Sequence, residues 1–283
     1  MLSSILPFFA ADQIPFVMST TSLSDICADS RKIVSQTADF IRAELGKVSD
    51  QQIEVKELNS LVSYVDQHAE RQLVEGLQGM LPEAVFLTEE ETVARQEGAW
   101  RWIIDPLDGT TNFLHQLPFF SISVALQHQD ELVMGIVMEV MREECFYAWK
   151  DGGAWLNGRP ISVSANTQLS ESLLATGFPY YDFDRMDAYL ALLKDLMQSS
   201  RGIRRLGSAA LDLAYVACGR FDGFFEYGLN AWDVAAGVLL VEEAGGKVTD
   251  FSGGNNFLFG GELLSGSQPT QEALAAKVQQ YFA

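Results

Sequence analysis

Apolar residues recur at helical spacing in two early segments of the chain, and each spacing predicts an amphipathic helix. The first helix is expected to end at Gly46, with one face formed by Ile26, Ile33, Val34, Thr37, Phe40, Ile41 and Leu45. The second helix lies within residues 61–82, with one face formed by Ala69, Leu73, Val74, Leu77 and Met80. Ser63 and Asp66 stand just ahead of this second face, at the spacing of a capping box.

Short apolar runs rich in β-branched and aromatic residues follow, and they predict strands. Residues 84–87 and 102–104 each form one such run. Residues 119–164 contain several more, separated by the turn signals HQDE, KDGG and LNGRP. We therefore expect an antiparallel meander over this stretch.

Beyond Ser164 the helical and extended patterns alternate. Predicted strands lie at 172–178, 221–228, 247–251 and 262–267, with a short strand or a link at 202–207. Predicted helices lie at 184–199, from the Ser208 cap to Gly219, from Asp233 to the glycines 245–246, and at 271–282. A helix-plus-meander half, residues 21–164, is thus followed by an alternating α/β half, residues 165–283.

Residues 1–20 begin with a short apolar stretch that no Lys or Arg precedes, which argues against a secretory signal. Met18 and the small polar residues after it form a second plausible start. We expect this segment to be a poorly packed extension or a misassigned start.

The chain is strongly acidic, with 19 Lys and Arg against 38 Asp and Glu and a formal net charge of −19. This charge repels phosphate backbones, and the only tight basic group is RGIRR at residues 201–205. No apolar run reaches the about 18 residues that a membrane-spanning helix needs. We therefore expect neither a nucleic-acid partner nor a membrane partner.

The three cysteines and three histidines show no paired or zinc-ligand spacing. Cys218 falls at an apolar helical position, so we expect it to be a buried free thiol. Unpaired cysteines fit a reducing compartment, and we expect a cytoplasmic protein.

Carboxylates stand where the predicted apolar elements end or begin. Glu89, and then Asp105 and Asp108, each follow a strand, and Asp233 begins a helix. Strand ends and helix starts tend to line one edge of a sheet, where ligands bind. Acids gathered there repel one another unless a cation neutralises them, and oxygen ligands without His or Cys favour Mg²⁺, Mn²⁺ or Ca²⁺.

The segment 105–110, DPLDGT, is expected to form a turn. Pro106 and Gly109 would bend the chain so that both aspartates and the Leu107 carbonyl face one point. The amides of Gly109 and Thr110 could then hold an anion, and the Thr110 hydroxyl could orient a water.

Each of these residues also has a purely structural explanation. These explanations are turn formation at Asp105 and Asp108, a helix N-cap at Asp233, a simple capping box at Ser63 and Asp66, a solvated charge run at Glu89, Glu90 and Glu91, and a surface or packing role for His115. It is their joint occurrence that favours a site.

Two long motifs carry a resemblance to a known family. WIIDPLDGTTNF at 102–113 matches W-[IV]-I-D-P-[IL]-D-G-T-x-N-[FY], and WDVAAGVLLVEEAGG at 232–246 matches W-D-x-A-A-G-x-x-[IL]-[VL]-x-E-A-G-G. An upstream D-x-x-x-E appears in LVSYVDQHAE, and the usual G-E-E appears as TEE, with Thr88 in place of glycine. Over about residues 24 to 275 the chain resembles the inositol monophosphatase family of metal-dependent, lithium-sensitive phosphatases.

The resemblance implies a layered α/β/α/β/α fold, usually a homodimer, with about two or three Mg²⁺ ions, Mn²⁺ as a substitute and Li⁺ as an inhibitor. It assigns the metal to Glu89, Asp105, the Leu107 carbonyl, Asp108 and Asp233. It assigns the catalytic water to Asp66 and Thr110, together with Glu89. It assigns phosphate to the Gly109 and Thr110 amides and the rest of the substrate site to Asp108, the Ala209 amide, Glu226 and Asp233.

The chemistry agrees with these residues. Phosphate-ester hydrolysis needs charge neutralisation and a water made nucleophilic at neutral pH, which a metal ion supplies. The sequence offers no nucleophile elbow and no convincing triad, so we expect direct attack by water without a phosphoenzyme.

The first hypothesis is therefore a Mg²⁺-dependent phosphomonoesterase acting on a small polyol phosphate, foremost myo-inositol monophosphate. Histidinol phosphate, fructose 1,6-bisphosphate and adenosine bisphosphate are alternatives within the fold, and Arg204 and Arg205 could serve a second phosphate. The competing class is a non-catalytic binding module, which a lost metal ligand would mark, and none is lost.

Overall fold

The computed structural model describes residues 22–57, 60–179 and 183–282. The helices are α1 (Leu23–Glu44), α2 (Tyr64–Met80), α3 (Thr110–Leu114), α4 (Met186–Ser199), α5 (Ala209–Ala217), α6 (Ala231–Glu243) and α7 (Gln268–Phe282), with 3₁₀ turns at Asp50–Gln52 and Leu169–Glu171. The strands are β1 (Ile53–Glu57), β2 (Ser60–Ser63), β3 (Val85–Thr88), β4 (Trp100–Asp108), β5 (Ser121–His128), β6 (Glu131–Glu139), β7 (Glu144–Trp149), β8 (Ala154–Leu156), β9 (Arg159–Ile161), β10 (Leu173–Thr176), β11 (Gly202–Arg204), β12 (Gly223–Tyr227), β13 (Lys247–Thr249) and β14 (Glu262–Gly266).

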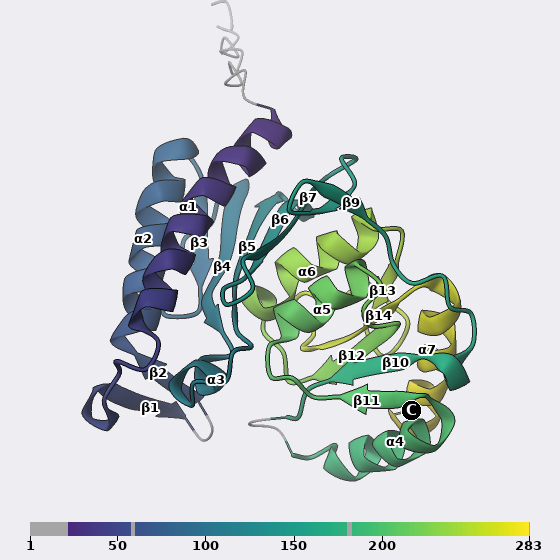
Figure 1. Cartoon of the computed structure of the whole chain (residues 1–283). Coiled ribbons are helices and arrows are strands. Elements are labelled where there is room, and N and C mark those ends of the chain that lie inside the picture. Colours follow the sequence, from purple (N-terminus) through teal and green to yellow (C-terminus); the bar gives the residue numbers. More distant parts are fainter. Residues whose placement is uncertain (1–21, 58–59, 180–182, 283) are drawn as a thin grey trace, which may run out of the picture.

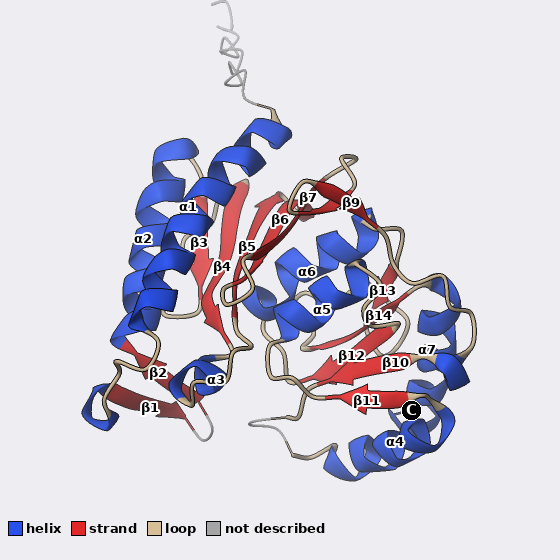
Figure 2. Cartoon of the chain, in the orientation of Figure 1, coloured by secondary structure: helices blue, strands red, loops and turns tan. Residues whose placement is uncertain are grey.

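Helices and sheets alternate in layers (Figures 1 and 2). Helices α1 and α2 cover the outer face of a seven-stranded sheet, and α5 and α6 lie between that sheet and a five-stranded one. Helices α4 and α7 cover the far face of the smaller sheet. The expected layered α/β/α/β/α fold is confirmed.

The larger sheet has the strand order β3-β4-β5-β6-β7-β8-β9. Strands β3 and β4 are parallel, and every later pair is antiparallel, so the predicted meander is correct. Helices cover both faces of its centre, which is why β5 and β6 are buried along most of their length.

The predicted turn at DPLD is wrong, because these residues belong to β4. Asp105 pairs with Ser123 and Asp108 with Ser121, so the two residues 106 and 107 stand opposite one residue of β5. This is a β-bulge, a position in a sheet that tolerates proline. The chain turns only at Gly109, whose φ of 97° lies in the left-handed region, and enters the unpredicted helix α3.

The predicted helix within 61–82 begins later than its apolar pattern suggested. Residues 60–63 form β2, which pairs with β1 in a hairpin that the sequence analysis did not predict. Ser63 is extended and is the N-cap of α2, with Asp66 completing the capping box. Ser63 is therefore both the last residue of β2 and the N-cap of α2.

The smaller sheet has the order β11-β10-β12-β14-β13, with β10 parallel to both β11 and β12 and the pairs involving β14 antiparallel. Helix α6 begins at Ala231, slightly before the predicted start at Asp233, because Asn230 is its N-cap. A Cβ at Gly237 would lie 2.5 Å from the Leu213 side chain, so this glycine lets α5 and α6 pack closely.

Three remaining expectations concern the ends and surfaces of the chain. Cys27, Cys145 and Cys218 are free, but Cys218 is only half-buried, because it is the C-cap of α5 and not part of its packed face. Within the described residues, no helix is both long and apolar enough to cross a membrane. The expectation for residues 1–20 lies outside the described residues.

Candidate active site

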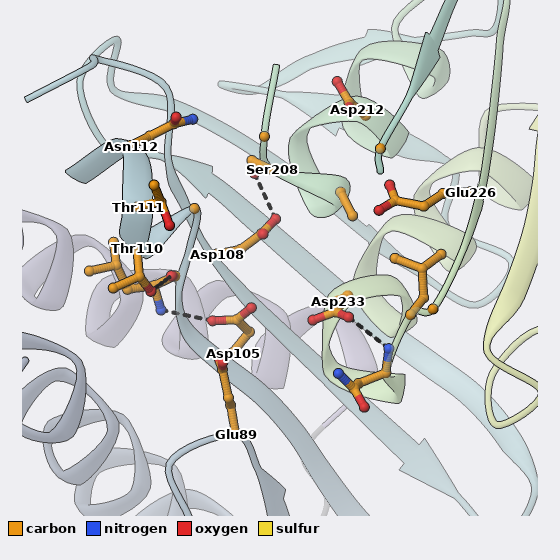
Figure 3. Close-up of a pocket in the computed structure, with 18 of the residues that line it drawn as sticks. Glu89, Asp105, Asp108, Thr110, Thr111, Asn112, Ser208, Asp212, Glu226 and Asp233 are labelled. Atoms are coloured by element: carbon orange, nitrogen blue, oxygen red, sulfur yellow. Dashed lines mark hydrogen bonds between the residues drawn. The ribbon is translucent and has the colours of Figure 1, made fainter. Parts of the chain in front are cut away.

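A pocket of about 140 Å³ lies where the bulged end of β4 meets α3 and the first residues of α5 and α6. Its lining includes Glu89, Asp105, Leu107, Asp108, Gly109, Thr110, Ser208, Ala209, Glu226 and Asp233. Figure 3 shows the carboxylates of Asp105, Asp108 and Asp233 facing a common space, with Glu226 at one side and Glu89 at the other. Most of the residues that the sequence analysis assigned to a site are thus brought together.

Hydrogen bonds from nearby groups orient the side chains of Asp105 and Asp108. The amide of Leu107 donates a 2.9 Å hydrogen bond to Oδ1 of Asp105, which holds that side chain at the bulge. Oδ2 of Asp108 accepts hydrogen bonds from the Ser208 hydroxyl at 2.6 Å and from the Ala210 amide at 2.8 Å. The bulge of β4 and the start of α5 therefore fix both carboxylates.

Burial and mutual repulsion perturb these acids strongly. Burial, followed by the charges of Glu89, Asp108 and Asp233, raises the pKa of Asp105 well above its usual range. Burial raises the pKa of Asp108 to about 6, although its bonds from Ser208 and Ala210 oppose the rise. Burial and then the Asp108 charge raise the pKa of Asp233 to about 8. Such shifts are typical of acids clustered in a buried functional site, and a bound cation would oppose them.

The donor set fits Mg²⁺. Among the described residues no three Asp, Glu, His or Cys side chains lie close enough to enclose an ion by themselves. Mg²⁺ does not need such a cage, because it usually binds one or two carboxylates and keeps water or substrate phosphate as its other ligands. Asp105 lies beside Glu89 and Asp108 beside Asp233, which supplies carboxylates in pairs.

A second group of residues joins α2 to α3. The Thr110 hydroxyl lies 2.9 Å from Oδ1 of Asp66 and 3.0 Å from the Leu107 carbonyl. Oδ2 of Asp66 accepts hydrogen bonds from the Ser63 amide and hydroxyl. Asp66 is almost fully buried, and burial raises its pKa although these bonds oppose the rise. The capping box of α2 therefore orients Asp66, which in turn contacts the pocket residue Thr110.

The far side of the pocket contains a second set of ionisable residues. Burial raises the pKa of Glu226, on β12, to about 8, against the opposing charge of Arg205. A Cβ on Gly177 would lie only 1.9 Å from the Glu226 carboxylate, so glycine leaves the room that this side chain occupies. Asp212, on α5, is also buried, and burial raises its pKa well above the usual range.

The structure also places the other residues that the sequence analysis considered. Arg204 is exposed and directs its guanidinium to the Ile203 carbonyl, whereas Arg205 lines the pocket. His115 is exposed at the end of α3. The Ala209 amide lies against Asp108, whose pKa it lowers.

The profile of the Inositol monophosphatase family matches residues 23–283. The chain belongs to the inositol monophosphatase family. This family member is 46% identical, over 237 residues, to Inositol-1-monophosphatase of Rhizobium meliloti, a match that covers 83% of this chain and 89% of that protein. It is 42% identical, over 232 residues, to Nus factor SuhB of Pseudomonas aeruginosa, covering 80% and 86%.

Solved structures show the same fold. The crystal structure of extragenic suppressor protein suhB from Bartonella henselae superposes on this inositol monophosphatase family member with a TM-score of 0.85 at 38% identity. The match covers 89% of this chain and 98% of that one.

The sequence analysis of this family member missed several pocket residues. Ser208 was expected only as a helix cap, yet its hydroxyl also bonds Asp108. Asp212 was not singled out, although an acid within the apolar run AALDLAYVA is itself a signal. Arg205 was considered for a second phosphate, but its position opposite Glu226 could not be read from local sequence.

Proposed function

We propose that this chain is a Mg²⁺-dependent phosphomonoesterase that hydrolyses a small polyol phosphate, foremost myo-inositol monophosphate. The observation that carries the proposal is the convergence of Asp105, Asp108 and Asp233 on one pocket that also contains Glu226. Family membership and 46% identity to a protein named Inositol-1-monophosphatase support it.

The metal ligands in this proposal are Glu89, Asp105, the Leu107 carbonyl, Asp108 and Asp233, with Mn²⁺ as a substitute for Mg²⁺. When bound, the metal neutralises phosphate charge and lowers the pKa of a water. Burial and then repulsion among these acids raise the pKa values of Asp105 and Asp233, and this supports the assignment because a bound cation would relieve the repulsion.

Thr110 and Asp66 would orient the attacking water. The water would donate a hydrogen bond to the Thr110 oxygen. The Thr110 hydroxyl would at the same time donate its own hydrogen bond to Oδ1 of Asp66, 2.9 Å away. Positioned proton acceptors of this kind contribute to hydrolysis by directing the water's lone pair at phosphorus. No covalent intermediate is formed, and trapping a phosphorylated residue during turnover would contradict this route.

The substrate would lie between two sides of the pocket. The amides of Gly109 and Thr110 would hold the phosphate, and Glu226 would bind hydroxyl groups of the polyol. A buried carboxyl with a pKa of about 8 can donate as well as accept a hydrogen bond near neutral pH, which suits a hydroxyl partner. Arg205 also lines the pocket, and its positive charge could bind a second phosphate, so a bisphosphate is the alternative substrate.

A phosphate-release panel tests the proposal. Myo-inositol monophosphate, histidinol phosphate, fructose 1,6-bisphosphate and adenosine bisphosphate would be compared at millimolar Mg²⁺. We expect the inositol ester to lead and Asp105→Asn to abolish Mg²⁺-dependent release while the protein stays folded. A wide lead for fructose 1,6-bisphosphate would overturn the substrate, and no release from any ester would overturn the enzyme.

A second candidate function rests on the relative named Nus factor SuhB, which is 42% identical to this chain. The net charge of −19 disfavours direct RNA binding, so such a role would depend on a protein partner. Complementation of Pseudomonas aeruginosa depleted of SuhB separates the two functions. Rescue by Asp105→Asn would support a role independent of hydrolysis, and failure of both the wild type and the variant would exclude it.

We also propose a homodimer in the cytoplasm. The free cysteines Cys27, Cys145 and Cys218 fit a reducing compartment. Light scattering coupled to size-exclusion chromatography would measure the mass, and a monomer would contradict the dimer.

A further inference from the structure

Glu70 is a fully buried acid that lies outside the pocket, on α2 one turn beyond Asp66. Its Oε1 atom accepts hydrogen bonds from the Thr88 hydroxyl at 3.0 Å, the Thr92 amide at 2.7 Å and the Thr92 hydroxyl at 2.6 Å. Its Oε2 atom accepts one from the Glu90 amide at 2.7 Å. The donors therefore surround Glu89 on both sides along the chain.

The segment that donates these bonds has little other regular structure. It leaves β3 at Thr88 and bends through Glu91, whose φ of 50° lies in the left-handed region that favours glycine. The Glu89 amide retains a sheet-like bond to the Ile104 carbonyl. A strained bend persists only when its surroundings hold it, and the four hydrogen bonds to the Glu70 carboxylate hold this segment from inside.

Helix α2 thereby reaches two parts of the pocket at once. Asp66 and Glu70 stand one helical turn apart, so their side chains lie on the same face. Asp66 bonds Thr110 at the start of α3, and Glu70 bonds the segment at the end of β3. The spacing between Thr110 and Glu89 is thus set by one rigid helix.

We propose that Glu70 is a positioning residue for metal binding, which holds Glu89 toward Asp105 by bonding the residues on either side of it. The inference rests on the proposed function, because it takes Glu89 as a metal ligand. Thr88, the residue that departs from the family's glycine, supplies one of the donors. Outer groups that orient metal ligands commonly matter nearly as much as the ligands.

Isothermal titration of the full chain with MgCl₂ alone tests the proposal without any substrate. Glu70→Gln keeps one accepting oxygen and replaces the other with an NH2 group, which cannot accept the bond from Glu90 or, in the other orientation, those from Thr88 and Thr92. We expect it to raise the Kd for Mg²⁺ by about 10- to 100-fold. Glu75→Gln, on the exposed face of the same helix, makes the same chemical change and should leave the Kd unaltered.

Kinetics separate positioning from a merely structural role. Because Glu70 would touch no substrate, Glu70→Gln should regain most of its kcat at saturating Mg²⁺ and keep the wild-type KM for the phosphate ester. A lower melting temperature with an unchanged Kd for Mg²⁺ would overturn the proposal, since the bonds would then serve stability alone.

A second pair of variants covers the case in which Glu70→Gln does not fold. Thr92→Val removes only the hydroxyl bond and should raise the Kd for Mg²⁺ by about tenfold, whereas Thr92→Ser keeps the hydroxyl and should restore it. If both variants bound Mg²⁺ with equal affinity, the role of Glu70 would be overturned. The proposed function would still stand in that case, provided that the wild-type chain binds Mg²⁺. A wild-type chain that binds no Mg²⁺ would overturn both.

Discussion

The Thr110 hydroxyl donates a 2.9 Å hydrogen bond to Asp66, a residue 44 positions earlier in the chain. The remaining oxygen of Asp66 is held by the Ser63 amide at 2.9 Å and by the Ser63 hydroxyl at 2.8 Å. The orientation of Asp66 is therefore set by the start of its own helix, and Oδ1 is left for Thr110. The pair is formed by the fold before any ligand arrives.

Removing the Thr110 hydroxyl tests this pair. Thr110→Val keeps the side-chain volume but can neither accept a proton from water nor donate one to Asp66. We expect kcat for phosphate release to fall by about 10²- to 10⁴-fold with little change in KM. Thr110→Ser should retain most of the activity, and a Thr110→Val enzyme as fast as the wild type would exclude the proposed role.

The stability of the metal-free chain should depend on pH through the acids of the pocket. The folded pKa values of Asp108, Asp233 and Glu226 are raised to about 6, 8 and 8, so the folded state binds their protons more tightly than the unfolded state does. All three are protonated in both states below about pH 4, and the folded state is penalised progressively as pH rises toward about 8. In EDTA the melting temperature should therefore fall between these limits.

The control for that titration is Asp233→Asn, which removes one of the three groups. Its melting temperature should fall less steeply than that of the wild type over the same pH range, because fewer carboxyls lose a proton. A variant with the wild-type slope would mean that Asp233 is not among the groups responsible.

Mg²⁺ should stabilise the folded chain near neutral pH. A ligand that binds only the folded state adds about 2.7 kcal/mol when present at 100 times its Kd, and the cation here also relieves carboxylate repulsion. Differential scanning calorimetry with and without EDTA measures the shift. An unchanged melting temperature would show that the acids do not act as one metal site.

Glu226 should matter only for substrates with hydroxyl groups. Glu226→Leu keeps much of the side-chain volume but cannot hydrogen-bond the polyol, which should cost about 1.4 kcal/mol, or about tenfold in KM for myo-inositol monophosphate. Hydrolysis of p-nitrophenyl phosphate, which has no polyol, serves as the matched control and should be unaffected. Equal losses for both substrates would place the effect at the metal or the phosphate instead.

Lithium should inhibit the phosphatase, since resemblance to this lithium-sensitive family implies a site where Li⁺ replaces one Mg²⁺. Initial rates measured over rising LiCl, with NaCl at matched ionic strength as the control, give the inhibition. Full activity at high LiCl would contradict this prediction.

Local patterning predicted most helices and strands, and the places where it failed have identifiable causes. The bulge at DPLD was expected as a turn because Asp-Pro and Asp-Gly favour turns by themselves, but pairing with Ser121 and Ser123 of β5 keeps the segment in the sheet. Strand β1 was not predicted, and most of β2 fell within the segment 61–82 that was predicted to contain a helix, because no apolar run separates the strand from the helix. In both places pairing with a second strand decides the local structure, and the pattern of a single segment does not show that pairing.

The sequence by itself determined the order of most elements, the two motifs and the identity of the acids, because these depend on neighbouring residues and on residue type. Only the tertiary structure decided that Asp66 lies against Thr110, that Glu226 faces Arg205, and that Glu70 holds the segment around Glu89. Those contacts join distant parts of the chain. The raised pKa values of Asp105 and Asp233 depend on burial and on the distances between the acids, which arise only when the layers are packed together.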